Sequence, residues 1–259
     1  MRIPDEVFKC VVFVGLDKPT MPMGVDFIGT AFFVLIPSSI KGTSYIYIVT
    51  AKHIAEKLGN KDFIIRINTR DGRSLILEAE GAKWFTHPTD SSVDVAVLPH
   101  APSKTEFDYK AVHVESFLSE EIIRKEGIGV GDEVFITGLF VSASGSARNQ
   151  PILRIGNVAM MPDEALPTKW GNIEAYLIEA RSLGGLSGSP AFVRATTGRS
   201  YLLGLMRGHW DIPAETEEIY VKVNVGIAIV EPARKILEVL NHPELIKTRE
   251  QNDKRLLLK

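Results

Sequence analysis

Short apolar runs of strand length recur along the whole chain, and they constrain its fold more than any other feature of the sequence. The runs are rich in β-branched and aromatic residues, with glycine, proline and Asp-Gly between most of them. An α/β fold would need helices of about 10 to 15 residues between strands. The spacing therefore predicts an all-β antiparallel barrel or sandwich. The predicted strands cover residues 27–37, 44–50, 62–68, 74–80, 94–99, 133–140, 175–181, 190–194, 201–207 and 221–230.

Helices are few in this pattern. The spacing of apolar residues predicts helices only at 51–58 and 231–240. A charged stretch between 100 and 128 separates the strands into two halves, where a connection between lobes is expected. We therefore predict an N-terminal β lobe, an inter-lobe connection, a C-terminal β lobe and a solvated charged tail. Their ranges are 1–110, 111–128, 129–245 and 246–259.

Composition excludes several classes of partner. The chain of 259 residues is 45% hydrophobic, with 30 basic and 32 acidic residues. This balance gives no general attraction to nucleic acid or to an anionic membrane, so neither is expected as a partner. Cys10 is the only cysteine, which rules out an intrachain disulfide. No stretch approaches the ~18 apolar residues of a membrane span, and no signal-peptide core is visible, so we expect a cytoplasmic location.

The stretch GGLSGSPAF raises the question of whether Ser187 is a nucleophile or a turn serine. Acyl transfer by serine needs a base, a carboxylate that orients the base, and N–H donors for the oxyanion. His53 follows a predicted strand in VTAKHIAEKL, and Asp94 begins the strand DVAVLP. The order is His, Asp, Ser. This order differs from the subtilisin order, which is Asp, His, Ser. The α/β-hydrolases have the nucleophile first, in a G-x-S-x-G motif, and here Ser189 stands in place of the last glycine. Only the chymotrypsin order remains.

Each residue has a competing interpretation. His53 alone would more often be a partly buried structural residue, and Asp94 alone could be a turn residue at a strand end. Asp90 is the nearest competitor of Asp94, but no apolar strand follows it. Ser182 and Ser189 compete with Ser187, whose Gly-x-Ser-Gly frame favours it.

At these residues the sequence resembles the trypsin-like (chymotrypsin-fold) serine peptidases, particularly the disulfide-free bacterial branch that includes the high-temperature-requirement proteases. The similar blocks are VTAKHI, DVAVL, GLSGSP, GVGDEVFITGLF and VGIAIVEPARKILEVL. The resemblance implies two six-stranded antiparallel β-barrels with a C-terminal helix and a site in the cleft between the barrels. The first barrel would supply His53 and Asp94, and the second Ser187. The N–H groups of Gly185 and Ser187 would form the oxyanion hole, and no metal or cofactor would be needed.

Departures from the family pattern limit what the resemblance implies. Leu186 stands where digestive members carry an aspartate, so activation by N-terminal cleavage is not expected. Arg181, six residues before the nucleophile, would line the primary pocket and favour acidic substrate side chains, or else would end its strand and point to solvent. Arg207 and Gly208 are further candidate substrate-binding residues. Arg207 lies in the strand whose edge should pair with the substrate backbone and is expected to contact Asp94, and Gly208 is expected to lie on the pocket rim. We expect no PDZ module, because too few residues follow the last predicted helix.

Two functions remain open at this point. The first is a serine endopeptidase that acts on protein or peptide substrates through an acyl-enzyme. The second is a protease-fold binding or regulatory module, inactive until a protein partner orders its cleft. A complete set of three residues favours the first, because a binding module has no physical need for all three.

Overall fold

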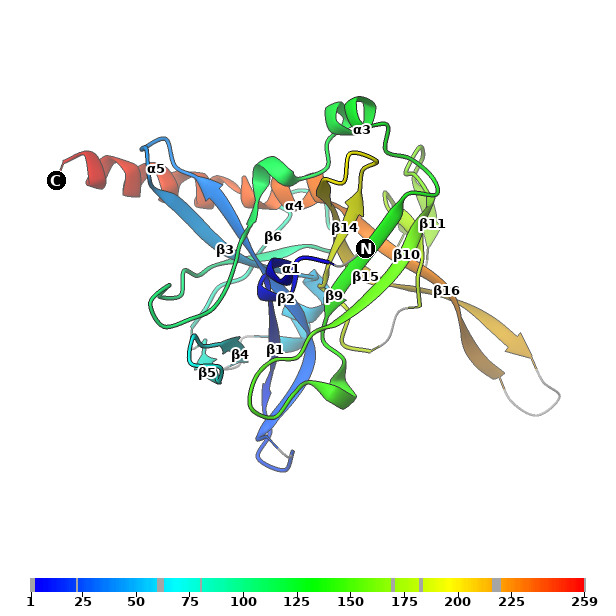
Figure 1. The fold of residues 1–259 in the computed structure, drawn as a ribbon, viewed down its shortest axis with the longest axis horizontal. Coiled ribbons are helices and arrows are strands. Elements are labelled where there is room, and N and C mark those ends of the chain that lie inside the picture. The colour runs from blue at the N-terminus through cyan, green and yellow to red at the C-terminus, as the bar shows by residue number, and fades with distance from the viewer. Residues whose placement is uncertain are drawn as a thin grey trace.

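The computed structural model shows an all-β protein of two lobes with helices at its C-terminal end (Figure 1). This confirms the predicted all-β architecture with a C-terminal helix. The structure describes residues 3–21, 23–59, 63–79, 81–168, 171–181, 184–215 and 220–258.

The N-terminal lobe is an eight-stranded sheet in the order β5-β4-β1-β2-β3-β7-β6, with β8 paired in parallel to β2. Among the described residues its hydrogen bonds follow an open path from β5 to β6. The strands are β1 (Val11–Asp17), β2 (Val25–Pro37), β3 (Ser44–Thr50), β4 (Phe63–Asn68), β5 (Ser74–Glu78), β6 (Phe85–Thr86), β7 (Ala96–Pro99) and β8 (Val112–His113).

Strand β1 was not predicted, although it lies between β2 and β4 in the middle of this sheet. The charged residues that interrupt the N-terminal apolar run belong to a separate short helix, α1 (Asp5–Lys9). The residues after α1 are buried from Val11 to Val14. Because α1 and β1 follow each other directly, the charged residues of the helix interrupt the apolar run in the sequence, and the strand was not predicted.

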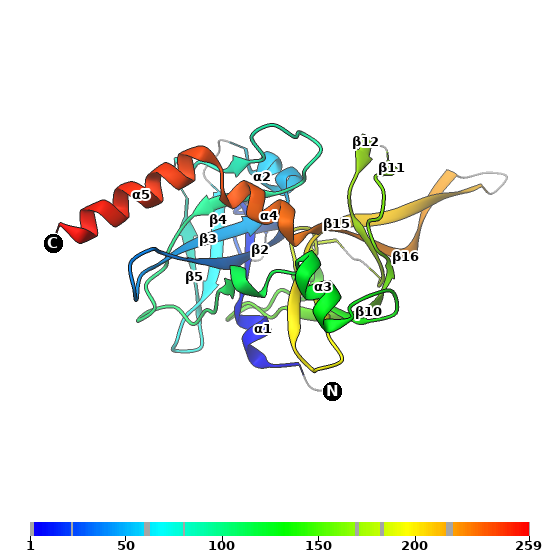
Figure 2. The ribbon, with the colours of Figure 1, turned by 90° about the horizontal axis from the view of Figure 1, so that it is seen from above.

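The C-terminal lobe is a closed six-stranded barrel in the order β10-β13-β16-β15-β14-β9, which confirms the predicted second barrel. Strands β15 and β16 continue beyond the barrel as a two-stranded ribbon (Figure 1), and β11 and β12 form a small separate sheet (Figure 2). The strands are β9 (Glu133–Gly138), β10 (Ile152–Met160), β11 (Leu166–Thr168), β12 (Gly171–Ile173), β13 (Tyr176–Glu179), β14 (Pro190–Arg194), β15 (Ser200–Glu215) and β16 (Tyr220–Pro232).

The segment between the lobes holds a short helix, α3 (Glu120–Glu126), that the sequence did not predict. The hydroxyl of Ser119 caps it by accepting from the N–H of Ile122, and Gly127 ends it with a φ of +66°. The lobe boundaries themselves stay a prediction.

One hydrophobic cluster joins the two lobes. It combines side chains of the first lobe, of the second barrel and of helix α4 (Ala233–Leu240), as the residues Phe32, Ile48, Val97, Phe135, Phe192, Leu205, Ile236 and Leu240 illustrate. A separate cluster fills the interior of the second barrel. The shared cluster packs the two lobes against each other.

The expected solvated tail is instead a docked helix, α5 (Pro243–Leu257). Its Asp253 accepts hydrogen bonds from the hydroxyls of Ser38, Ser39 and Tyr45, and Arg249 Nη1 donates to Tyr47 Oη at 3.0 Å. The high charge suggested solvation, but these charged groups bind the β2–β3 hairpin.

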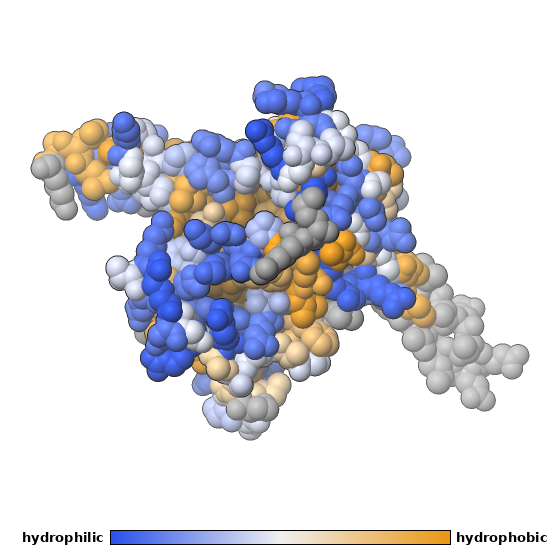
Figure 3. All heavy atoms as spheres, in the orientation of Figure 1, coloured by the Kyte–Doolittle hydropathy of each residue, from blue (hydrophilic) through white to orange (hydrophobic). Residues whose placement is uncertain are grey.

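The end of α5 projects from the body and forms an apolar tip, where Leu256, Leu257 and Leu258 are exposed (Figures 1 and 3). Within the described ranges, no helix has the length and apolar character needed to cross a membrane.

Candidate active site

The three predicted residues come from separate elements of both lobes. His53 lies in α2 (Lys52–Leu58), directly after β3 and at the predicted helix. Helix α2 buries Ile54, Ala55 and Leu58, so His53 is left on its accessible side. Asp94 lies in the loop before β7, between two buried valines, and Ser187 lies in the loop before β14.

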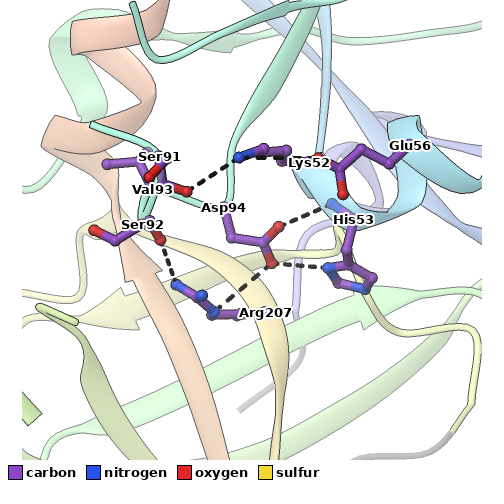
Figure 4. Close-up of a pocket in the computed structure, with 8 residues that line it drawn as sticks. All are labelled: Lys52, His53, Glu56, Ser91, Ser92, Val93, Asp94 and Arg207. Carbon is purple, nitrogen blue, oxygen red and sulfur yellow. Dashed lines mark hydrogen bonds and ion pairs between the residues drawn. The ribbon is translucent and has the colours of Figure 1, made fainter. Parts of the chain in front are cut away.

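His53 and Asp94 form a close pair (Figure 4). His53 Nδ1 lies 2.8 Å from Asp94 Oδ2, and the His53 backbone N–H donates to Asp94 Oδ1 at 2.9 Å. The His53 side chain is 33% exposed and that of Asp94 only 7%. An ionised Asp94 can only accept, so the proton between them belongs to Nδ1, and Nε2 is free to act as a base.

Arg207 lies behind this pair. Its Nε is 3.9 Å from Asp94 Oδ2, which confirms the predicted contact, and its Nη1 donates to the Ser92 carbonyl at 2.9 Å. Nη1 also lies 3.0 Å from Oε2 of Glu231, a buried residue of β16 that sequence reasoning missed. Burial raises the pKa of Glu231 to about 7, against the lowering effect of the Arg207 charge. The only sequence signal was a carboxylate at the end of the apolar run 221–230.

A cavity of about 360 Å³ opens beside the pair, as Figure 4 shows. Its polar lining includes His53, Asp94, Arg207, Lys52 and Glu56. Lys52 Nζ donates to the Ser91 carbonyl at 3.0 Å across one side of it. The candidate base therefore faces a space large enough for part of a substrate.

The loop that carries Ser187 depends on two glycines. Gly185 and Gly188 have φ angles of +100° and +83°, a region that other residues rarely adopt. A Cβ atom at Gly188 would collide with the carbonyl of Thr30 and the hydroxyl of Thr50. Glycine at this position therefore lets the loop of the second lobe approach the end of β3, close to His53.

The polar groups of this loop are only partly paired. The N–H of Ser189 donates to the Leu186 carbonyl at 2.9 Å, which closes a tight turn around Ser187. Within the described chain, the N–H groups of Gly185 and Ser187 have no protein acceptor. Among the described residues, no hydrogen bond joins Ser187 Oγ to His53 either. The geometry thus has a formed base–acid pair, unpaired backbone donors and a half-buried serine nearby.

Three residues compete with Asp94 and Ser187 for the catalytic roles: Asp90, Ser189 and Ser182. The Asp90 carboxylate accepts from Ser92 Oγ at 2.6 Å and from the Ser92 N–H at 2.9 Å, and makes no bond to His53. Ser189 is fully buried. Ser182 lies outside the described residues.

The predicted specificity residues are less informative. Arg181 is exposed just beyond β13, and its carbonyl accepts from Arg154 Nε at 2.9 Å. Gly208 lies in β15, where an added Cβ would meet open space. Their pocket roles stay predictions. In the part of the chain that the structure describes, no group of three His, Cys, Asp or Glu residues could hold a metal ion.

Comparison with known proteins shows likeness of fold. No protein-family model and no curated protein matches the chain. The solved structure of Deg5 is 18% identical, with 90% of this chain and 88% of that chain covered and a TM-score of 0.54. The apo MamO protease domain from Magnetospirillum magneticum is 19% identical, with 90% and 96% covered and a TM-score of 0.52.

A third solved structure agrees with these two. Rv3671c from M. tuberculosis H37Rv, in the inactive form of a serine-to-alanine mutant, is 18% identical, with 91% and 86% covered and a TM-score of 0.52. These similarities confirm the predicted trypsin-like fold.

Proposed function

We propose that the protein is a serine endopeptidase with His53, Asp94 and Ser187 as its catalytic residues. The observation that carries this proposal is the 2.8 Å contact between His53 Nδ1 and Asp94 Oδ2 beside an open cavity. A buried carboxylate that holds one nitrogen of a half-exposed imidazole leaves the other nitrogen as a general base. The protease-domain fold of the solved neighbour MamO supports a protein or peptide substrate.

In the proposed reaction Ser187 Oγ attacks the carbonyl carbon of a peptide bond while His53 Nε2 takes the hydroxyl proton. Asp94 accepts a hydrogen bond from Nδ1–H and thereby stabilises the imidazolium. The oxyanion is stabilised by the N–H groups of Gly185 and Ser187, which have no protein acceptor among the described residues. His53 then protonates the leaving amine, and water releases the acyl group from Ser187. The predicted cytoplasmic location is part of this proposal.

One observation favours the alternative of a binding or regulatory module. No hydrogen bond joins Ser187 Oγ to His53 in the described residues, so a partner could be needed to complete the site. Catalytic hydrogen bonds are often long without substrate and tighten when it binds, so this observation does not outweigh the His53–Asp94 pair.

Labelling with a fluorophosphonate probe, read by mass spectrometry, tests the proposal. We expect an adduct on Ser187 that is lost in Ser187→Ala and His53→Ala. The matched control is Ser189→Ala, which changes the neighbouring serine and should leave labelling intact. A folded protein without an adduct would overturn the endopeptidase and favour the module.

A further inference from the structure

Thr30 joins the two halves of the candidate site through its backbone and its side chain. It lies in β2 of the first lobe and is 0% exposed. Its N–H donates to the Ser187 carbonyl at 3.0 Å. Its hydroxyl donates to the Gly185 carbonyl at 2.8 Å and accepts from the Leu139 N–H at 2.9 Å. All three partners belong to the second lobe.

The remaining polar atom of Thr30, its carbonyl oxygen, is bonded to the segment that leads to His53. The Thr30 carbonyl accepts from Thr50 Oγ1 at 2.7 Å, and Thr50 ends β3 three residues before His53. Thr30 therefore lies between the segment that carries His53 and the loop that carries Ser187. No other residue that the structure describes bonds to both.

The hydroxyl of Thr30 fixes a peptide plane between the two proposed oxyanion donors. The carbonyl that it holds belongs to the peptide between Gly185 and Leu186. The next plane carries the N–H of Ser187 and is held at its Leu186 carbonyl by the Ser189 N–H. With both planes fixed, the direction of the Ser187 N–H is set before a substrate arrives.

Leu139 supports the same arrangement from the other side. A Cβ atom on Gly185 would lie 2.9 Å from the Leu139 carbonyl, so the loop rests directly on this residue. The Leu139 N–H is in turn held by Thr30 Oγ1. One hydroxyl thus fixes both the loop and the backbone beneath it.

We propose that Thr30 is a positioning residue that sets the direction of the Ser187 N–H, one of the two proposed oxyanion donors, and the spacing between His53 and Ser187. This inference rests on the proposed function. Thr30 acts through the loop and does not touch the substrate. A serine at position 30 would keep the hydroxyl, whereas a valine would keep the shape and leave the Gly185 carbonyl and the Leu139 N–H buried without a partner.

The test compares Thr30→Val with Thr30→Ser. The matched control is Thr137→Val, because Thr137 is also fully buried but its hydroxyl has no hydrogen-bond partner among the residues that the structure describes. On a peptide substrate we expect Thr30→Val to lower kcat by roughly 10- to 100-fold with little change in KM. Thr30→Ser and Thr137→Val should stay within about threefold of wild type. Equal losses in Thr30→Val and Thr30→Ser, or an unchanged kcat in folded Thr30→Val, would overturn the inference.

Hydrogen exchange separates this inference from the proposed function. The N–H groups of Gly188 and Ser189 are bonded within the fold, to Met206 and Leu186, and report on the loop without catalysis. We expect faster exchange at both in Thr30→Val and not in Thr137→Val. A wild-type protein without peptidase activity would overturn the proposed function only. In that case, unchanged hydrogen exchange at Gly188 and Ser189 in Thr30→Val would overturn the role of Thr30. If Thr30→Val does not fold, Thr50→Val removes the link toward His53, and wild-type exchange and kcat in that variant would contradict the inference.

Discussion

Arg207 and Glu231 form a buried ion pair, with 3.0 Å between Nη1 and Oε2, directly behind the carboxylate of Asp94. The guanidinium lies closer to Glu231 than to Asp94, whose Oδ2 is 3.9 Å from Nε. Asp94 keeps its shorter contact to His53, with 2.8 Å between Oδ2 and Nδ1, as the proposed function requires.

The Glu231 pair makes stability depend on pH. Burial raises the pKa of Glu231 from 4.5 to about 7 in the folded protein. The folded state therefore holds this proton more tightly, and the resulting stability is complete below the ordinary pKa and is lost as pH rises through about 7. We expect wild type to lose about 2 kcal/mol relative to Glu231→Gln between about pH 5 and about pH 8. Urea unfolding of both proteins measures this, and parallel pH profiles would contradict it.

Replacement of Arg207 should cost more stability when Glu231 is present than when Glu231 has already been replaced. Arg207→Met leaves the Glu231 and Asp94 carboxylates buried without the guanidinium, which costs about 3 kcal/mol of unfolding free energy. The same change in a Glu231→Gln background should cost clearly less, since one uncompensated charge is gone. A double-mutant cycle by urea unfolding gives the coupling energy, and additive losses would show that the two residues act independently.

On the proposed function, Asp94→Asn should abolish most activity without unfolding the protein. An amide in place of Oδ2 donates to His53 Nδ1 and moves the ring hydrogen to Nε2, which can then no longer act as a base. We expect kcat to fall by about 10³ to 10⁴. Asp90→Asn is the matched control and should keep wild-type kcat, because the Asp90 carboxylate accepts from Ser92 and makes no bond to His53 among the described residues. The reverse result would exchange the roles of the two aspartates.

Arg66 should hold the loop between β9 and β10 onto the first lobe. It is buried in β4 and donates from Nη1 to the Gly145 carbonyl at 2.7 Å and from Nη2 to the Ser146 carbonyl at 2.9 Å. Lysine cannot reproduce this fork, so Arg66→Lys should lose about 2 kcal/mol of stability and expose residues 141–148 to proteases. Arg70→Lys, at an exposed arginine nearby, should change neither. Intact protection of the loop in Arg66→Lys would contradict the prediction.

Asp253 should anchor α5. The hydrogen bond from Ser38 is the largest of the effects that lower the pKa of Asp253 to about 2. The contribution of the ionised Asp253 to stability is therefore present above its ordinary pKa and is lost as pH falls through about 2. Asp253→Asn at neutral pH should therefore speed hydrogen exchange along residues 243–257. Glu250→Gln on the exposed side of the helix is the control. Equal exchange in both variants would mean that α5 is held by other contacts.

The sequence was most informative where a signal is local. Helix α2 with His53, the strand after Asp94 and the glycine turn around Ser187 each show their pattern within about ten residues, and their positions were predicted on that basis. The closed second barrel followed from the resemblance to the trypsin-like serine peptidases, whereas the strand spacing alone predicted a barrel or a sandwich. Strand β1 was missed because a charged helical turn adjoins it.

The partners of the site were harder to predict because they are distant in the chain. In the sequence Glu231 is a polar residue after an apolar run, with nothing that predicts a role in the site. Its contact with Arg207 is visible only in the folded protein. Thr30 reads as an interior residue of a strand, and its hydroxyl meets Gly185 from 155 residues away. Helix α5 lacked an apolar stripe, since it docks through charged and hydroxyl groups.

The docking of α5 also sets an order of events during synthesis. The bond between Ser38 and Asp253 closes a separation of 215 residues. At the usual speed of translation, about 5 to 20 residues per second, the β2–β3 hairpin waits roughly 10 to 40 s for its partner helix. During that interval the β2–β3 hairpin of the nascent chain lacks the hydrogen-bond partners that Asp253 and Arg249 later supply.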